Sequence, residues 1–392
     1  MSHKLISLNT DLKKLRDEGY EVNIVNDHLV VTSIPYVKSN KEIAFGFFVC
    51  PLNFVGEKLS SPPDHTVHFA GDHPCDKNGS PLTGVVNSPQ KKIITGDISV
   101  DYYLSAKPPS GKYEDFYEKI TTYVKIFEVH AKSINPKVSS KTFKAIKINE
   151  PSSIFNYCDT NSSRAGIQMV SAKLEKLKIA IIGLGGTGSY ILDYVSKTPV
   201  EEIHLFDGDE FLLHNAFRSP GAPTEEELNG GLKKVDYFSD IYSKMRKNIF
   251  SHSYYIEESN LDELAGMDFV FICIDRSEGK KKIFEKLINL DIPFIDVGTG
   301  VNEIDNSLIG TVRSTTVNSE NNSHIEKRIS FSDVVNNDYD QNIQIAELNA
   351  LNASFAVIKW KKMLGFYHEQ GNEYNVLYEI STNKLHNNEH KT

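Results

Sequence analysis

The sequence predicts an α/β protein in which a doubly wound, mostly parallel sheet follows a smaller N-terminal α+β domain. Three observations predict this fold. From residue 178 onward, short apolar stretches alternate with stretches of helical periodicity, as in parallel sheets covered by helices. A glycine-rich turn follows the first of these apolar stretches. Residues 1–150 instead carry alternating strand patterns between two helical patterns.

The chain has 392 residues, enough for two or three domains. We expect an accessory α+β domain over residues 1–150 that recruits a partner. A linker and the start of a helix bearing Arg164 are expected over 151–170, and a nucleotide-binding domain over 171–392. The linker is indicated by the Pro, Ser and Asn residues of segment 135–163.

The elements of the first domain can be assigned from its periodicity. We expect helices over residues 9–18 and 113–130 and strands over 20–24, 29–32 and 43–50. Four potential metal ligands lie between the last strand and the second helix: His65, His68, His73 and Cys75. Their spacing matches no familiar ligand pattern, so a hydrogen-bonded loop is the stronger interpretation.

A glycine motif follows the predicted buried strand 178–182 and precedes a helical pattern at 189–197. It consists of Gly183, Gly185, Gly186 and Gly188. A strand, a turn and a helix in this order place unpaired backbone N–H groups and the positive helix end at one point, where a phosphate can bind. Glycine is needed there because a Cβ would keep the phosphate from the backbone. The spacing predicts a Rossmann-like nucleotide site, although a tight structural turn gives the same pattern.

Polar residues follow the next predicted strands. Strand 202–206 ends in Asp207 and Asp209, and strand 268–274 ends in Asp275. Because ligands bind at the carboxyl ends of parallel strands, we expect these carboxylates to line the pocket of the glycine turn. An amide and two cations lie between the two strands in the chain: Asn215, Arg218 and Lys234.

Two kinds of nucleotide are compatible with parts of this pattern. Asp207 lies about 20 residues beyond the glycines, where NAD enzymes bind a ribose hydroxyl, so an NAD(P)-dependent oxidoreductase is one hypothesis. The whole set favours a triphosphate with Mg²⁺. Arg218 and Lys234 can neutralise an α-phosphate, and Asp275 can hold the metal. A hydride carrier has little need for these cations.

Composition excludes several other classes of protein. The net charge of −9 argues against nucleic acid and anionic membranes as partners. No apolar run approaches the roughly 20 residues of a membrane span, and the N-terminus lacks a signal-peptide core. Four scattered cysteines indicate a reducing compartment and argue against zinc. We therefore expect a cytoplasmic protein without zinc.

The ordered set GLGGTGS, D-G-D, N-x-x-R, K-V and C-I-D resembles the E1/ThiF/MoeB adenylyltransferases, which activate ubiquitin-like proteins or sulfur carriers. The resemblance covers roughly residues 160–365, including a late helix over 343–362. The N-terminal half resembles a domain of unknown function that is fused to bacterial ThiF-like proteins. The genes of those proteins lie beside genes for ubiquitin-like conjugation components.

The resemblance implies a role for each motif. The four glycines would receive ATP, and Asp207 its ribose. Three residues would contact phosphates: Asn215, Arg218 and Lys234. Asp275 would organise Mg²⁺. Arg164 occupies the position of an arginine that reaches the other subunit's active site, so a homodimer is implied. A partner's C-terminal carboxylate would attack the α-phosphate, giving an acyl-adenylate and pyrophosphate. The partner would be a ubiquitin-like or sulfur-carrier protein, and an E2-like protein is a further expected partner.

Structural roles are the alternatives for several of these residues. Asp209 can cap its loop, and Arg164 can be a solvated residue before a helix. Arg218 and Lys234 can be surface charges, although their place in the ordered pattern argues against this. Lys233 competes with Lys234 for the lysine position, and only the following valine favours Lys234.

The sequence departs from the family in its cysteines. The zinc-binding pairs are missing, and no cysteine follows Cys273, so a transferable thioester is in doubt. Cys273 lies in an apolar strand, as core residues do. Cys75 is the best remaining thiol, but a structural role is the stronger interpretation. Segment 302–342 is rich in Asn and Ser, and we expect it to be mobile and to guide a partner's tail.

Three hypotheses therefore remain. The first is an ATP-dependent E1-like adenylyltransferase in a bacterial ubiquitin-like conjugation pathway. The second is the NAD(P)-dependent oxidoreductase. The third is a nucleotide-binding scaffold without adenylation activity. The completeness of the polar set argues against the third, and pyrophosphate exchange separates the first from both others.

Overall fold

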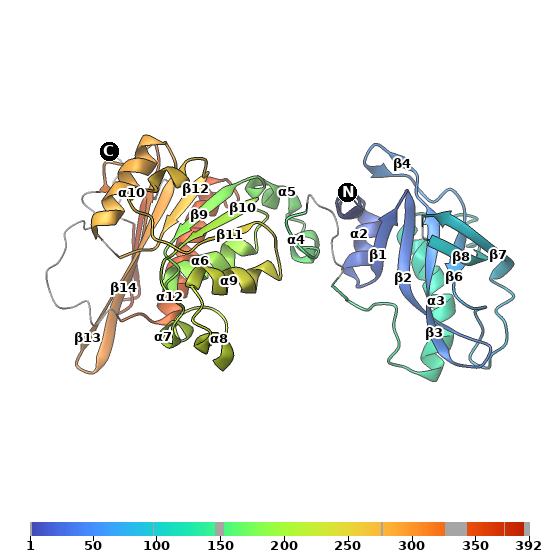
Figure 1. Ribbon diagram of the computed structural model, residues 1–392. Coiled ribbons are helices and arrows are strands. Elements are labelled where there is room, and N and C mark those ends of the chain that lie inside the picture. The colour runs from blue at the N-terminus through green and yellow to red at the C-terminus, as the bar shows by residue number, and fades with distance from the viewer. Residues whose placement is uncertain are drawn as a thin grey trace. The chain divides into compact units, whose positions relative to one another are not determined.

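The computed structural model describes residues 2–96, 98–145, 153–275, 277–325, 343–371 and 373–387. The chain forms two compact units (Figure 1). The first unit comprises Met1–Pro151 and Tyr157–Ile167, and the second comprises Ser152–Asn156 and Gln168–Thr392. The expected fold class, a doubly wound α/β sheet with a smaller α+β domain, is confirmed. The expected domain limits stay predictions.

The first unit contains a six-stranded antiparallel sheet in the order β1-β2-β3-β6-β8-β7. Its strands are β1 (Glu21–Val25), β2 (His28–Val37), β3 (Ile43–Pro51), β6 (Thr66–Ala70), β7 (Val86–Thr95) and β8 (Ile98–Ser105). A small ribbon is formed by β4 (Phe54–Val55) and β5 (Lys58–Leu59). The helices are α1 (Ser2–Leu8), α2 (Thr10–Asp17), α3 (Phe116–Ile134) and α4 (Thr160–Ala165).

Helix α3 covers one face of this sheet. It begins after Asp115, whose carboxylate accepts a hydrogen bond from the Glu118 N–H at 2.7 Å and so caps the helix. Phe127 of α3 packs against Phe48 of β3 and Phe69 of β6 with ring centroids 5.4 and 5.0 Å away. These rings form the centre of the first unit's core. The helices expected near residues 9–18 and 113–130 are therefore present.

The second unit contains an eight-stranded sheet in the order β11-β10-β9-β12-β13-β14-β15-β16. Its strands are β9 (Lys178–Ile182), β10 (Glu202–Phe206), β11 (Ile249–His252), β12 (Phe269–Ile272), β13 (Phe294–Ile304), β14 (Ser307–Val317), β15 (Asn375–Glu379) and β16 (Lys384–His386). The strands from β11 to β13 pair in parallel, and the rest pair antiparallel. The switch point of the parallel part lies between β9 and β12, where such sheets bind ligands.

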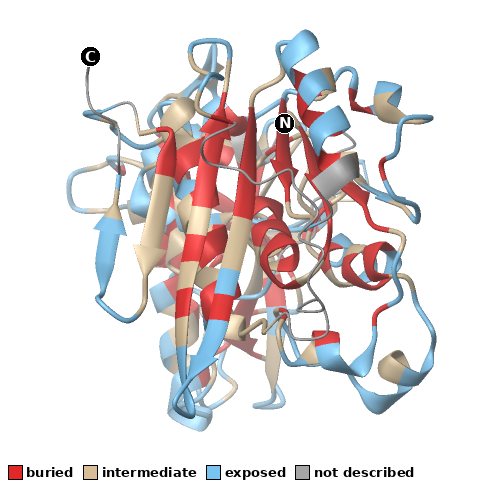
Figure 2. Ribbon diagram, turned by 90° about the vertical axis from the view of Figure 1, so that its left-hand side faces the viewer, coloured by how far each residue is buried: buried red, intermediate tan, exposed pale blue. Residues whose placement is uncertain are grey.

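Helices cover both faces of this sheet, as the alternation along β9 shows. Ile179 and Ile181 pack in the core beneath α6 (Gly186–Ser196), α9 (Lys234–Ser243) and α12 (Ala346–Met363). Ala180 and Ile182 belong to the opposite core, which is covered by α10 (Ser277–Asn289). Figure 2 shows that the buried residues follow the central strands and the inner sides of these helices. The short helices are α5 (Gln168–Ser171), α7 (Leu213–Ala216), α8 (Glu225–Asn229) and the 3₁₀ turns Ala172–Leu174 and Leu261–Leu264.

One expectation for the second unit is wrong in part. The segment from residue 302 was expected to form a mobile loop, but β13 and β14 pair in continuous register from Phe294 and Val317 to Ile304 and Ser307. The tip of this hairpin is exposed (Figure 2) and carries Asn306 and Ser307. Residues 326–342 lie outside the described residues. Among the described helices, none has the length and apolar character needed to cross a membrane.

Candidate active site

The glycine turn is fixed between the carboxyl ends of two neighbouring strands. Gly183 directly follows β9 and has a φ of +91°, a conformation that residues with a Cβ rarely adopt. A Cβ on Gly183 would also lie 2.6 Å from the Cys273 carbonyl oxygen, just beyond β12. On the other side, the Gly183 N–H donates to the Phe206 carbonyl at the end of β10. Glycine at this position is therefore required by the fold itself.

Helix α6 begins directly after this turn and packs onto it. A Cβ on Gly188 would overlap the Gly183 carbonyl oxygen, so the helix can approach the strand end only because residue 188 is glycine. A Cβ on Gly185 would meet no atom within 4 Å. The N–H groups of the first helical turn have no carbonyl partner within the helix, and the positive end of its dipole lies there. The open space beside Gly185 is thus suited to a phosphate.

Asp207 joins this turn to the end of β10. Its Oδ2 accepts the Leu184 N–H at 2.6 Å, and its Oδ1 accepts the Asp209 N–H at 2.9 Å. The residue is 5% exposed. Both backbone bonds fix the carboxylate, and a carboxylate oxygen still has a lone pair for one more donor.

Lys234 lies against the two carboxylates at this strand end. Its Nζ is 2.7 Å from Asp209 Oδ2 and 3.7 Å from Asp207 Oδ1, and its side chain is buried. Tyr255 donates from its hydroxyl to the other oxygen of Asp209. Lys233 instead donates to the Gly208 carbonyl at 2.9 Å. Of the two lysines that competed in the sequence, Lys234 is the one at the carboxylates.

The segment after β10 brings Asn215 and Arg218 to the site. Asn215 on α7 is buried, and its Oδ1 accepts the Leu212 N–H at 2.9 Å. Asn349 of α12 donates to the Arg218 carbonyl at 3.2 Å. The same amide accepts the Thr187 hydroxyl, also at 3.2 Å, in the first turn of α6. Asn349 therefore ties the Arg218 segment to the start of the glycine helix.

Arg218 occupies a half-buried position with carboxylates nearby. Burial lowers the pKa of its guanidinium, and the charges of Asp275 and Asp209 act in the opposite direction. The guanidinium stays protonated under all ordinary conditions. Within the part of the chain that the structure describes, the buried Nε of Arg218 has no hydrogen-bond partner. A buried unpaired donor is costly, so this edge of the arginine is suited to an anionic ligand.

Asp275 follows β12 and is exposed at the carboxyl end of the sheet. No group of three or more His, Cys, Asp or Glu side chains among the described residues is arranged to hold a metal ion. Mg²⁺ usually needs only one or two carboxylates, because nucleotide phosphates and waters supply its remaining ligands. Asp275 beside the glycine turn fits that requirement.

Arg164 belongs to a different part of the molecule from the other predicted residues. It lies on α4 in the first unit. Within that unit it lines a cavity of about 270 Å³ together with Arg16, Tyr20 and Cys158. The structure thus brings together the other predicted residues in the second unit, and the intersubunit role of Arg164 stays a prediction.

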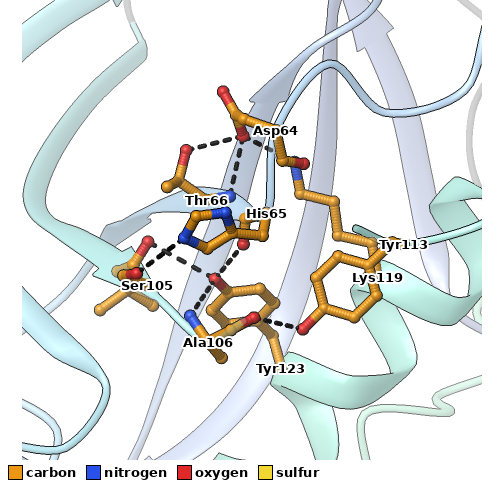
Figure 3. A network of polar contacts seen from close by, with 9 residues as sticks. Asp64, His65, Thr66, Ser105, Ala106, Tyr113, Lys119 and Tyr123 are labelled. Atoms are coloured by element: carbon orange, nitrogen blue, oxygen red, sulfur yellow. Dashed lines mark hydrogen bonds and ion pairs between the residues drawn. The ribbon is translucent and has the colours of Figure 1, made fainter. Parts of the chain in front are cut away.

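The histidines of the first unit form structural contacts. Lys119 is fully buried, and its Nζ lies 3.3 Å from Asp64 Oδ1 (Figure 3). His65 contacts the Ser105 hydroxyl at 3.1 Å, and its carbonyl accepts a hydrogen bond from Tyr123. This network ties α3 to the sheet. The expectation of a loop is wrong in part, because His68 lies on β6, where its ring packs 5.1 Å from that of Tyr103.

Two cysteines can be compared with their expected roles. Cys75 is buried, and its thiol donates to the His73 carbonyl at 3.3 Å. Burial raises the pKa of the Cys75 thiol and, more strongly, that of Cys273. Because the thiolate is the nucleophile, both environments suit structural cysteines.

Two residues of the site, Tyr255 and Asn349, were missed by the sequence reasoning. Three charged residues that pair with one another behind the Asp275 turn were missed as well: Lys280, Asp296 and Arg313. The clearest available signal was the pair Asn349 and Asn352 in an otherwise apolar helix, since buried amides need specific partners. Tyr255 gave no comparable signal, because it lies outside any motif.

Parts of this chain are similar to known proteins. Residues 10–160 match a domain of unknown function (DUF6791), and residues 161–386 match the ThiF family. The ubiquitin-like modifier-activating enzyme 5 of Culex quinquefasciatus is 24% identical over 156 residues, 36% of this chain and 38% of that protein. The enzyme of the same name from Dictyostelium discoideum is 25% identical over 152 residues, 36% of this chain and 40% of that protein. The chain therefore spans about two fifths of the length of these relatives.

Two solved structures are similar to this chain at a lower sequence identity. PaaA has a TM-score of 0.47 at 16% identity, covering 73% of this chain and 91% of its own. Escherichia coli MccB with MccA-N7isoASN has a TM-score of 0.47 at 16% identity, covering 57% of this chain and 70% of its own. Since the ThiF match covers more than half of the sequence, this chain belongs to the ThiF family.

Proposed function

We propose that this protein is an ATP-dependent, E1-like adenylyltransferase that activates the C-terminal carboxylate of a ubiquitin-like or sulfur-carrier protein. The observation that carries the proposal is the half-buried Arg218, whose unpaired Nε lies in a glycine-turn site with Lys234 and Asp275. Such a site offers cations to a phosphate and a carboxylate to a metal. A hydride carrier requires no metal and has little need for this set of cations.

Each residue has a role in this proposal. The open side of Gly185 and the start of α6 receive phosphates. Asp209, whose side chain is 48% exposed, accepts a ribose hydroxyl more easily than the buried Asp207, which orients the turn. Asn215 supports the segment that carries Arg218. Bound Mg²⁺, held by Asp275, would neutralise phosphate charge.

The reaction is a displacement at the α-phosphorus. A carboxylate oxygen of the partner's C-terminus forms the new bond to phosphorus, and the bond to the bridging oxygen of the β-phosphate breaks. Pyrophosphate leaves with that electron pair, so no proton transfer is needed at the attacking group. Arg218 and Lys234 stabilise the charge that builds on the α-phosphate oxygens, and electrostatic stabilisation of this kind usually contributes more to catalysis than any other effect.

The partners follow from the relatives and remain part of the proposal. The curated relatives are named as activators of ubiquitin-like modifiers. We propose a partner of that class, acting in a bacterial conjugation pathway with an E2-like protein and recruited by the first unit. We also propose a cytoplasmic homodimer in which Arg164 completes the partner's site.

Calorimetric titration separates this proposal from its alternatives. ATP with Mg²⁺ should bind, and NAD(H) should not. Binding of NADH in preference to ATP would support an oxidoreductase. ATP binding without pyrophosphate exchange, tested with ubiquitin-like and sulfur-carrier proteins, would support the scaffold.

A further inference from the structure

A buried cluster of charges lies behind the Asp275 turn. Asp296 on β13 is fully buried. Its Oδ1 lies 2.5 Å from Nζ of Lys280, in the first turn of α10. Its Oδ2 lies 2.6 Å from a guanidinium nitrogen of Arg313 on β14. We call these three residues the Asp296 cluster. None of them belongs to the motifs that predicted the site.

The Asp296 cluster is connected to the turn after β12 by one ammonium group. Asp296 pairs in register with Ile272, the last residue of β12. Lys280 Nζ also donates to the Ile274 carbonyl at 3.1 Å, and Ile274 directly precedes Asp275. Lys280 therefore joins a carboxylate fixed in the sheet to the backbone that carries Asp275.

The remaining oxygen of Asp296 is held by an arginine that fits closely. A Cβ on Gly298 would lie 2.8 Å from the Arg313 guanidinium, so the absence of a side chain at residue 298 leaves room for it. Arg313 also donates to the Thr315 hydroxyl at 2.5 Å. Both oxygens of the buried carboxylate thus face a cation. Its position has little freedom.

Stability alone is a weak explanation for this cluster. Burying a carboxylate and an ammonium carries a large desolvation cost, and apolar residues of similar volume often stabilise a core equally well. What apolar residues cannot supply is a donor to the Ile274 carbonyl. The charged cluster therefore differs from an apolar replacement in one respect: it holds the turn after β12 in a fixed position.

We propose that Lys280, anchored by Asp296, is a positioning residue that fixes the Asp275 carboxylate for the metal bound with the nucleotide. The inference rests on the proposed function, in which Asp275 holds Mg²⁺. Lys280 does not contact the nucleotide in this account. Its loss should abolish the effect of Mg²⁺ on ATP binding and leave metal-free ATP binding unchanged.

The test compares ATP affinity with and without Mg²⁺ in the full chain, by isothermal titration calorimetry. For the wild type, Mg²⁺ should strengthen ATP binding by about tenfold or more. The double variant Lys280→Met with Asp296→Leu removes the buried Lys280–Asp296 pair, and the partly exposed Arg313 keeps its hydrogen bond to the Thr315 hydroxyl. In this variant, the ratio of the ATP affinity with Mg²⁺ to the ATP affinity without it should fall to about one, and the ATP affinity without Mg²⁺ should be unchanged. Lys280→Arg should retain most of the ratio, because a guanidinium can reach both acceptors.

A matched control breaks an ion pair of the same length on the same helix. Lys286 Nζ lies 2.5 Å from Asp262 at the surface, and Lys286→Met with Asp262→Leu should keep the wild-type ratio. A folded Lys280/Asp296 double variant with the wild-type ratio would overturn the inference. If that variant does not fold, Lys280→Met alone replaces it, because Asp296 then keeps its pair with Arg313, and an unchanged ratio there has the same meaning. A wild type without any Mg²⁺ effect would instead refute the proposed function on which the inference rests.

Discussion

The ammonium group of Lys234 lies 2.7 Å from the Asp209 carboxylate and is held there at the end of β10. Asp207, on the other side, has both oxygens engaged by backbone N–H groups. The lysine is therefore buried in a position set by the sheet, and Asp209 is the more exposed partner. A phosphate can compete for this ammonium without disturbing Asp207.

The first prediction concerns this lysine. Lys234→Met should reduce partner-dependent pyrophosphate exchange by about a hundredfold or more, because a cation that stabilises the transition state is lost. Lys233→Met is the matched control, since the neighbouring lysine contacts the Gly208 carbonyl instead. Equal losses in both variants, with folding checked by circular dichroism, would contradict the assignment of Lys234.

The second prediction concerns Tyr255. Tyr255→Phe removes the hydroxyl that donates to Asp209 and should weaken ATP binding by about fivefold, the effect of roughly 1 kcal/mol. Tyr254→Phe removes a 2.7 Å hydrogen bond to Glu263 and should leave ATP affinity unchanged. Titration calorimetry on both variants checks this. An unchanged affinity in Tyr255→Phe would mean that the orientation of Asp209 does not matter for the nucleotide.

The third prediction separates two glycines of one motif. Gly183→Ala should destabilise the fold by about 2 kcal/mol or more, because its φ is positive and its Cβ would meet the Cys273 carbonyl. Gly185→Ala has room and should keep the thermal midpoint, but its methyl group would occupy the phosphate space and lower ATP affinity by about tenfold. Thermal melts and ATP titrations give both readings. A stable Gly185→Ala variant with wild-type ATP affinity would place the phosphates elsewhere.

The fourth prediction concerns pH. His252 lies 3.2 Å from His204, and burial, followed by the charge of His204, lowers its pKa. As pH falls below about 6.5, the unfolded chain binds the proton first, so the folded state loses stability. His252→Gln should therefore show a smaller drop in thermal midpoint than the wild type between about pH 7.5 and 5.5. An equal or larger drop would show that His252 does not contribute.

Site residues could be identified from the sequence where the local pattern and the chemistry of the residue agree. Gly183 was identifiable because a positive φ and a close approach leave glycine as the fitting residue. Asp207 and Asp275 were identifiable because the ends of parallel strands meet at one edge. The family resemblance added the order of the motifs, which no single motif provides.

The parts that the sequence did not predict depend on contacts between distant residues. Lys280 and Asp296 form a pair because α10 begins after β12, which lies beside β13, and neither residue is part of a local pattern. Tyr255 reaches Asp209 across β10 and β11 in the same way. The β13–β14 hairpin was interpreted as a loop because its exposed tip is polar. In each case the structure depends on contacts or strand pairing between residues that are far apart in the sequence.

The most direct test of the central claim is pyrophosphate exchange into ATP with a panel of purified ubiquitin-like and sulfur-carrier proteins. Wild type should exchange only with the free C-terminal carboxylate, and a C-terminally amidated partner should give none. Asp275→Asn should lower the rate by about a hundredfold or more. Exchange that is unaffected by amidation of the partner would contradict carboxylate adenylation. A folded, ATP-binding wild type that gives no exchange with any such partner would do the same.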